Sequence, residues 1–445
     1  MKLKSLKYHT REAKEYLAQR LIQLEQKNFR ITRDKLATGN LLKRACEIFS
    51  KTPTPKKCKI STQDCLMTGM AIHGLKSPSL LQFEDFMRNK ENEKNIKTLY
   101  HIKRIPCDTY FRERVDVLKT SLFRDVFTDY FALLQRGNIL KEYQFLEGHY
   151  LLSGDGTGYF SSSSIHCNEC CVKTHNNETK TYYHQMYAGA IVHPEKKQVI
   201  SLMPEFICLQ DGSSKNDCER NASERFYTHF RREHPHLKVI VVEDSLASNG
   251  PHLKRLSELK LHYIIGAKEG DHRVLFDWFK ASNPQELKIE CEKKEHYFRW
   301  MNGIPLNDSH FDYKVNFLEY RCENRYFTWV TDLTITAENV YDIMKGGRAR
   351  WKIENETFNT LKNMGYNFEH NYGHGYNHLS NNLATMMVLT FFIDQIQMMV
   401  NEFFQLAKLR LGTWKSLWNE IRVIIRYYSF ESWEMLYFKI TYDPP

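Results

Sequence analysis

Two carboxylates of this chain directly follow apolar runs, in positions where a side chain can do chemistry. Residues 150–154 (Tyr-Leu-Leu-Ser-Gly) run into Asp155, and residues 239–243 (Val-Ile-Val-Val-Glu) run into Asp244. Both runs are typical of buried strands, so each strand would present a carboxylate at its carboxyl end. A third segment, the Arg-Trp-Lys-Ile-Glu run at 350–354, ends 110 residues after Asp244 and has a helical pattern.

Several carboxylates that converge on one point form a site for divalent metal ions. Hard cations such as Mg²⁺ take oxygen ligands, and a pair of them needs more than one carboxylate. Asp155, Asp244 and Glu354 would be these ligands. If the third segment is helical, Arg350 and Lys362 lie near the same face as Glu354, because they are four and eight residues away from it. The set predicts a site for phosphoryl transfer.

Each of these residues also has an ordinary structural interpretation. An Asp-Gly pair such as Asp155-Gly156 often marks only a turn. Asp244 could cap the helix that follows it, and Arg350 with Glu354 could be a surface ion pair. The order of the elements favours a shared site: a strand-end Asp, a second strand-end Asp, a strand-rich insertion and then the helical Arg–Glu pair.

The rest of the sequence indicates an α/β fold. Strand patterns at 148–154, 182–193 and 198–208 come in hairpin order, and a helix, a strand, a helix and a strand follow up to residue 266. This order describes a mixed sheet with crossover connections. Strand-like segments at about 285–335 form an insertion ahead of Glu354. Helices are expected before residue 146 and after the insertion.

This combination resembles the bacterial insertion-sequence transposases of the DDE type, which have an RNase H-like catalytic core and a β insertion before the last catalytic residue. The signature of the subgroup is Tyr, two residues, Arg, three residues, Glu, six residues, Lys. Arg350 and Glu354 fit this signature. Gly347 stands where the Tyr is expected, and Leu361 stands where the Lys is expected, with Lys362 one step later.

The resemblance implies a role for each carboxylate. Asp155 would bridge two Mg²⁺ ions, for which Mn²⁺ can substitute, while Asp244 and Glu354 would each complete one ion. Glu356 is the alternative to Glu354, although two residues along a helix face different directions.

Contacts with DNA are implied as well. Arg350 and Lys362 would hold phosphates beside the metal ions. Trp300, in the insertion, would receive a base flipped out of the DNA, and core packing beside Phe298 is the alternative for this side chain.

The implied function is DNA transposition. The enzyme would bind the terminal inverted repeats of its element, as a homodimer on double-stranded DNA, cleave them and join the 3′ ends to target DNA. Residues 1–145 would be a basic, helical DNA-binding region, residues 146–380 the RNase H-like domain with its inserted β subdomain, and residues 381–445 a helical region for dimerisation. Two alternatives stay open: an inactive transposase-derived DNA-binding regulator, and an RNase H-like nuclease without strand transfer.

Charge and cysteine content are consistent with a DNA partner in the cytoplasm. The chain has a net charge of +10, and residues 1–60 hold 16 Lys/Arg against 5 Asp/Glu, which suits a polyanion partner. The odd count of 11 cysteines and a start without an apolar signal core favour a reducing, nucleoid-associated location over secretion. The most apolar stretch, 383–400, contains Asp394 and predicts a buried helix, with no membrane span.

A second metal site is indicated by Cys167 and Cys170, which form a Cys-x-x-Cys pair. A tetrahedral Zn²⁺ takes four ligands from sulfur and imidazole nitrogen. Buried thiols in a β hairpin are the alternative, because the sequence has no second Cys-x-x-Cys. The further ligand candidates are His175, His184, Cys208 and Cys218.

Overall fold

The computed structural model describes residues 35–209 and 217–442, which fall into two compact units. One unit, called here the helical unit, comprises Met1–Ile139 and Thr360–Pro445. The other, called the sheet unit, comprises Leu140–Asn359. Of the predicted DNA-binding region, residues 1–145, residues 1–34 lie outside the described residues.

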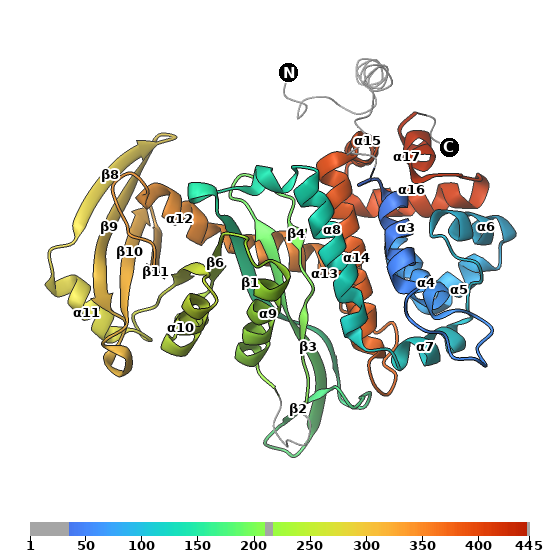
Figure 1. Ribbon diagram of the computed structural model, residues 1–445, viewed down its shortest axis with the longest axis horizontal. Helices are drawn as coiled ribbons and strands as arrows, with labels where there is room; N and C mark the ends of the chain where they lie inside the picture. Colours follow the sequence, from blue (N-terminus) through green and yellow to red (C-terminus); the bar gives the residue numbers. More distant parts are fainter. Residues whose placement is uncertain (1–34, 210–216, 443–445) are drawn as a thin grey trace. The chain divides into compact units, whose positions relative to one another are not determined.

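The sheet unit is built on one mixed sheet of 11 strands, as predicted for an α/β fold. The strand order is β2-β3-β1-β6-β7-β11-β10-β9-β8, and β4 and β5 pair with β3 (Figure 1). The strands are β1 (Tyr150–Ser162), β2 (Cys171–Thr174), β3 (Lys180–Val192), β4 (Ile200–Ser201), β5 (Glu205–Ile207), β6 (Val239–Glu243), β7 (His262–Gly266), β8 (Gln285–Cys291), β9 (Lys294–Pro305), β10 (Lys314–Cys322) and β11 (Arg325–Thr331).

Strand β1 is longer than the sequence predicted, and this changes the position of Asp155. β1 pairs in parallel with β6 only over Tyr150–Ser153, but its antiparallel pairing with β3 continues to Ser162. The sequence predicted that Asp155 ends its strand, and this prediction was wrong, because β1 continues beyond it. It lies just beyond the point where the parallel pairing with β6 stops, and Asp244 directly follows β6.

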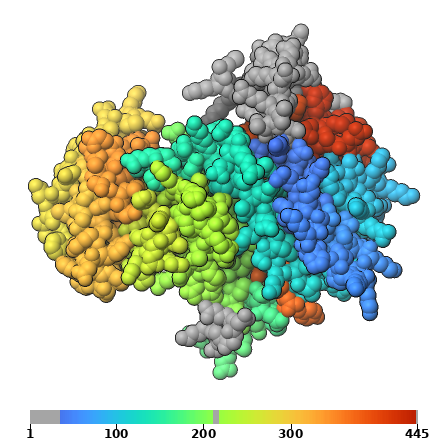
Figure 2. All heavy atoms as spheres, in the orientation of Figure 1, coloured from blue at the N-terminus to red at the C-terminus, as the bar shows by residue number. Residues whose placement is uncertain are grey.

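Helices cover both faces of the central strands. Side chains alternate between the faces of a strand. A β-carbon at Gly154 would point at the hydroxyl of Tyr227 on α9 (Glu219–Glu233), whereas the Ser153 hydroxyl donates to the backbone oxygen of Arg350 (3.0 Å), directly after α12 (Val340–Ala349). Helices α9 and α10 (Gly250–Glu258) pack against each other. Figure 1 shows both helices in front of the central strands, and their atoms are the yellow-green ones in Figure 2.

The strands of the predicted insertion do not form a sheet of their own. β11 pairs with β7 over Trp329–Thr331, and β10, β9 and β8 follow outward. Helix α11 (Arg273–Ala281) packs on β9. The insertion thus extends the central sheet, because β7 offers a free edge that hydrogen-bonds to the next strand.

The helical unit packs around one long apolar helix. Helix α14 (Leu379–Val400) contacts α3, α4, α7 and α15. It is the one helix among the described residues that is long and apolar enough to cross a membrane, and 89% of its most apolar window is buried, as the sequence predicted. The other helices are α3 (Thr38–Phe49), α4 (Thr62–Gly74), α5 (Leu80–Met87), α6 (Lys90–Leu99), α7 (Asp108–Asp116), α8 (Arg124–Arg136), α13 (Asn359–Asn363), α15 (Glu402–Leu411), α16 (Trp414–Tyr427) and α17 (Trp433–Tyr442).

Asp394, the charged residue in the apolar stretch, forms a buried ion pair. Its Oδ2 lies 2.5 Å from the Nζ of Lys76 and accepts a hydrogen bond of 2.6 Å from the Tyr366 hydroxyl. The Lys76 ammonium also lies 4.0 Å from the centre of the Trp418 ring. The Lys76 side chain is only 1% exposed, so water cannot stabilise its charge. The ammonium and the carboxylate therefore depend on each other for charge compensation.

We expect Asp394→Ala to destabilise the protein by about 3–5 kcal/mol, because it leaves the buried ammonium of Lys76 without its counter-ion. The double variant Lys76→Met/Asp394→Leu removes both charges and should lose much less. Urea unfolding followed by circular dichroism measures both effects. Equal losses in the single and double variants would contradict this account of the pair.

Candidate active site

Asp155 and Asp244 line the same cavity in the sheet unit. The cavity has a volume of about 310 Å³ and is bounded by Gly154 and Asp155 within β1, the end of β6, the start of α9 and the turn before α10. Asp155 Oδ1 accepts a hydrogen bond from the backbone of Gly156 (2.8 Å). Asp244 Oδ1 accepts one from Leu246 (2.9 Å), so this residue also caps the short turn Ser245–Ala247.

A further carboxylate, Glu219, belongs to this cavity, and sequence reasoning missed its role. It is the first residue of α9, a position where an acidic side chain is usually explained by the helix dipole. Its carboxylate lies against Gly156, where a β-carbon would come within 2.3 Å of Oε2. The glycine after Asp155 is therefore needed for the close approach of Glu219. The pairing of β1 with β6 brings Asp155 to Asp244, and the packing of α9 on β3 and β5 adds Glu219; the sequence displays neither relation.

The carboxylates of the cavity repel one another. Burial and the charge of Glu219 raise the pKa of Asp155 to about 7. Burial and the charge of Asp244 likewise raise the pKa of Glu219. Carboxylates with raised pKa values in a cavity are typical of functional sites, because a bound cation can offset their repulsion.

Arg350 and Glu354 are further charged neighbours of Asp155. Arg350 Nη1 lies 2.6 Å from Glu354 Oε1 and 3.7 Å from Asp155 Oδ2. The charge of Glu354 contributes to the raised pKa of Asp155. Glu356 instead interacts with Lys352: burial lowers the pKa of Lys352, and the charge of Glu356 opposes this shift. The geometry thus favours Glu354 over Glu356 as the companion of Asp155.

Glu354 lies on a π-helical segment, Ile353–Phe358, which joins the end of the α12 helix region to α13. The sequence predicted a regular α-helix here. Each π turn contains one residue more than an α turn, and such segments are rare and frequent at functional sites.

A second cavity, of about 450 Å³, shares Asp244 with the first. It is lined by Arg350 and by aromatic side chains, including Trp329. The same cavity reaches Gly347, the position at which the signature has Tyr. A β-carbon at Gly347 would come within 2.4 Å of Trp329 Nε1. The indole of Trp329 therefore fills the space that a tyrosine side chain would enter.

In the wall of the carboxylate cavity, Glu243 forms a buried hydrogen-bonded network. It accepts a hydrogen bond from the Tyr187 hydroxyl and lies 2.6 Å from His252 Nε2, and Tyr187 is 2.9 Å from the Tyr227 hydroxyl. Burial acts to raise the pKa of Glu243, but the charge of His252 and the hydrogen bonds to the carboxylate lower it overall. This network fixes the end of β6 and thereby the position of Asp244.

Two predicted DNA contacts lie outside these cavities. Lys362 belongs to the helical unit and pairs with Glu369 (2.8 Å). Trp300 is 3% exposed within the sheet, where it is in register with Leu318 of β10. This burial agrees with the alternative of core packing, and neither described cavity is lined by Trp300.

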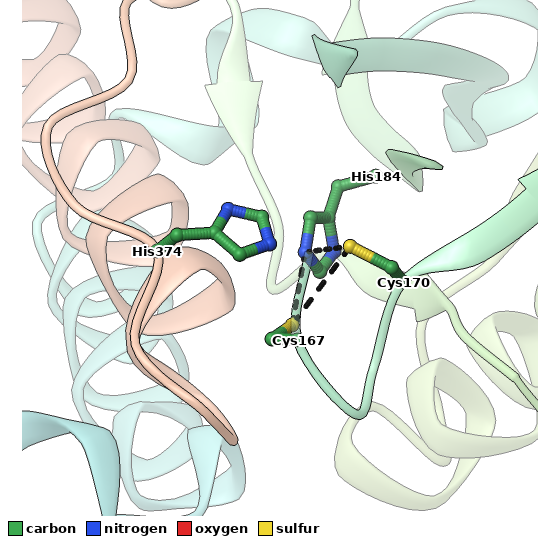
Figure 3. A group of neighbouring side chains, drawn as sticks. All are labelled: Cys167, Cys170, His184 and His374. Atoms are coloured by element: carbon green, nitrogen blue, oxygen red, sulfur yellow. Dashed lines mark hydrogen bonds between the residues drawn. The ribbon is translucent and has the colours of Figure 1, made fainter. Parts of the chain in front are cut away.

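The cysteine pair and one of the predicted histidines form a separate cluster in the sheet unit. Cys167 and Cys170 lie between β1 and β2, and His184 lies on β3. The two Sγ atoms are 3.9 Å apart, and His184 Nε2 is 3.4 Å from one and 3.3 Å from the other (Figure 3). These three residues are a candidate metal site. His374, the fourth side chain drawn, belongs to the helical unit.

The other ligand candidates have different surroundings. His175 is exposed and lies 2.8 Å from the Thr181 hydroxyl. Cys208 donates a hydrogen bond to Glu169 Oε2 (3.0 Å), and Cys218 is exposed as the N-cap of α9.

Comparison of the sequence with known family models and with curated proteins finds no match.

In the metal-free protein, Asp155→Asn should gain stability over the wild type as the pH rises. The raised pKa of Asp155 means that its contribution to stability is present below pH ~4 and is lost as the pH rises through about 7. The permanently neutral amide avoids this loss, which is a few kcal/mol at most, since one unit of pKa corresponds to about 1.4 kcal/mol. Thermal unfolding in the presence of a chelator, at a series of pH values, measures the difference.

The control for this series is Asp277→Asn, which changes an exposed carboxylate of α11. Asp277 lines neither cavity, so this variant serves as the comparison at each pH. A constant difference between Asp155→Asn and the wild type would show that the pKa of Asp155 is the same in the folded and unfolded protein, contrary to expectation.

Proposed function

We propose that the chain is a DNA transposase of the DDE type, with an RNase H-like catalytic core. The observation that carries the proposal is the convergence of Asp155, Asp244 and Glu219 on one cavity, with Glu354 joined to Asp155 through Arg350. The order of the central elements supports it: the antiparallel strands β1 to β5, then helix, strand, helix and strand. The predicted strand-rich insertion before Glu354 supports it too.

The carboxylate cavity fits hard divalent cations. Its oxygen ligands suit Mg²⁺ or Mn²⁺, and the raised pKa values of Asp155 and Glu219 reflect negative charge that a cation would offset. Asp155, Asp244, Glu219 and Glu354 would hold the ions. When bound, two such ions activate a water or a 3′-hydroxyl and stabilise the leaving oxygen of a phosphodiester.

The residues of the chain would orient the DNA around this centre. Arg350 carries a planar group that can hold a phosphate in two hydrogen bonds, once metal ions replace it as the partner of the carboxylates. The cavity beside it has aromatic walls, and Trp329 stands where the signature tyrosine would be. We propose that the Trp329 indole takes over the contact of that tyrosine.

The basic N-terminal region would bind the terminal inverted repeats, and the C-terminal helices would support a dimer on DNA at the nucleoid. The first test is the DNA that flanks the reading frame, which should carry inverted repeats bounded by short direct duplications. Flanks without them in every copy would favour a nuclease that hydrolyses DNA without strand transfer.

Asp155→Ala, Asp244→Ala and Glu354→Ala should each reduce Mg²⁺-dependent cleavage of the element ends by about 10²-fold or more, as expected for groups that stabilise charge in a transition state. Binding of the same DNA should persist, since other residues make the phosphate contacts. Cleavage of labelled end fragments and gel-shift binding measure the two properties.

Glu356→Ala is the matched control on the same π-helical segment and should retain cleavage. Loss of cleavage in Glu356→Ala with full cleavage in Glu354→Ala would reverse the assignment. A wild-type chain that binds the ends and never cleaves them would favour the inactive regulator.

Glu219→Gln should raise the Mg²⁺ concentration needed for half-maximal cleavage by about 10- to 100-fold, the effect typical of weakening a metal site. The reason is the loss of one negative charge beside Asp155 and Asp244. Glu224→Gln, an exposed residue of the same helix, is the control. An unchanged Mg²⁺ requirement in Glu219→Gln would exclude this residue from the metal site.

A further inference from the structure

The cluster of Cys167, Cys170 and His184 converges on a single point. A tetrahedral Zn²⁺ with Zn–S of about 2.3 Å and Zn–N of about 2.0–2.1 Å has S···S edges of about 3.8 Å and S···N edges of about 3.6 Å. The observed separations are 3.9, 3.4 and 3.3 Å. The three ligand atoms therefore already have the spacing of one triangular face of a zinc tetrahedron.

Hydrogen bonding among these groups explains the arrangement less well. A neutral imidazole nitrogen has one lone pair, so it can accept a good hydrogen bond from only one thiol. Both sulfurs nevertheless lie at nearly the same distance from His184 Nε2. A metal ion accounts for the equal approach, because it binds all three atoms at once.

Burial and charge are consistent with a zinc ion. Cys167, Cys170 and His184 are 9%, 2% and 1% exposed. Two thiolates balance the charge of Zn²⁺, so the loaded site has no net charge and burying it carries a small cost. Sulfur ligands also select zinc over Mg²⁺, which prefers oxygen.

The surrounding residues hold the imidazole in place. The His184 ring stacks on Tyr159 (5.6 Å between centres) and contacts Phe160 (5.8 Å), at the point where the β1–β3 register shifts. The shift between Gly158 and Phe160 turns these aromatic side chains toward the cluster.

We propose that Cys167, Cys170 and His184 supply three of the four ligands of a structural Zn²⁺, which connects the β1–β2 segment to β3. His184 pairs with Phe160, and Ala188, four residues further along β3, pairs with Asp155. The zinc site is therefore about 13 Å along the sheet from Asp155, at about 3.3 Å per residue, too far to take part in reactions there. The zinc ion would stabilise the β1–β3 pair that carries Asp155, independently of the reaction at the carboxylates.

The test is the metal content of the full chain, purified without chelator and measured by mass spectrometry of the elements. We expect about one zinc per chain in the wild type and at least a tenfold loss in Cys167→Ser/Cys170→Ser and in His184→Ala. Cys171→Ser is the matched control: it alters the neighbouring buried cysteine, which donates to Ile207 O and lies outside the cluster, and it should keep its zinc.

Wild-type protein provides a second measurement that does not depend on the folding of variants. Exchange of the metal for Co²⁺ should produce the intense thiolate-to-metal absorption and the visible bands of a tetrahedral site. Wild type with less than about 0.1 zinc per chain and no such spectrum would overturn the proposal. So would a Cys167–Cys170 disulfide in freshly isolated protein, or full zinc content in the natively folded double variant.

Discussion

Repulsion between carboxylates at the end of the β1–β6 pairing is the constraint on which the sheet unit depends. Like charges that line one cavity would separate unless the backbone around them were fixed. Glycines on β1 allow Tyr187 and Glu219 to approach the strand closely, and the buried Glu243–His252 pair fixes the end of β6. The local structure thus keeps in place an arrangement that is unfavourable until a cation binds.

Local patterns were sufficient to predict the elements but not their relations. The apolar runs before Asp155 and Asp244 do form strands, and the described part of the chain before residue 146 is helical, as expected. The predicted length of β1 was too short. The antiparallel pairing with β3 extends this strand through polar residues that lack a strand pattern. Glu219 was missed for a similar reason: its neighbours in the site come from strands remote in the sequence.

The insertion and the cysteine pair also show that local sequence patterns do not reveal which elements lie together in the fold. The strand-like segments after residue 284 were recognised, yet their attachment to β7 depends on a free edge that only the assembled sheet possesses. In the cluster, Cys167 and Cys170 were found from their spacing. Choosing His184 over His175 required the register of β3, which places one imidazole beside the sulfurs and leaves the other exposed.

The π-helical segment that carries Glu354 also bears on how a spacing signature should be counted. A wide turn absorbs one additional residue without changing the direction in which later side chains emerge. Residue numbers therefore overstate how far side chains have turned across Ile353–Phe358, compared with a regular α-helix. A spacing rule that counts regular α-helical turns does not apply unchanged along this segment.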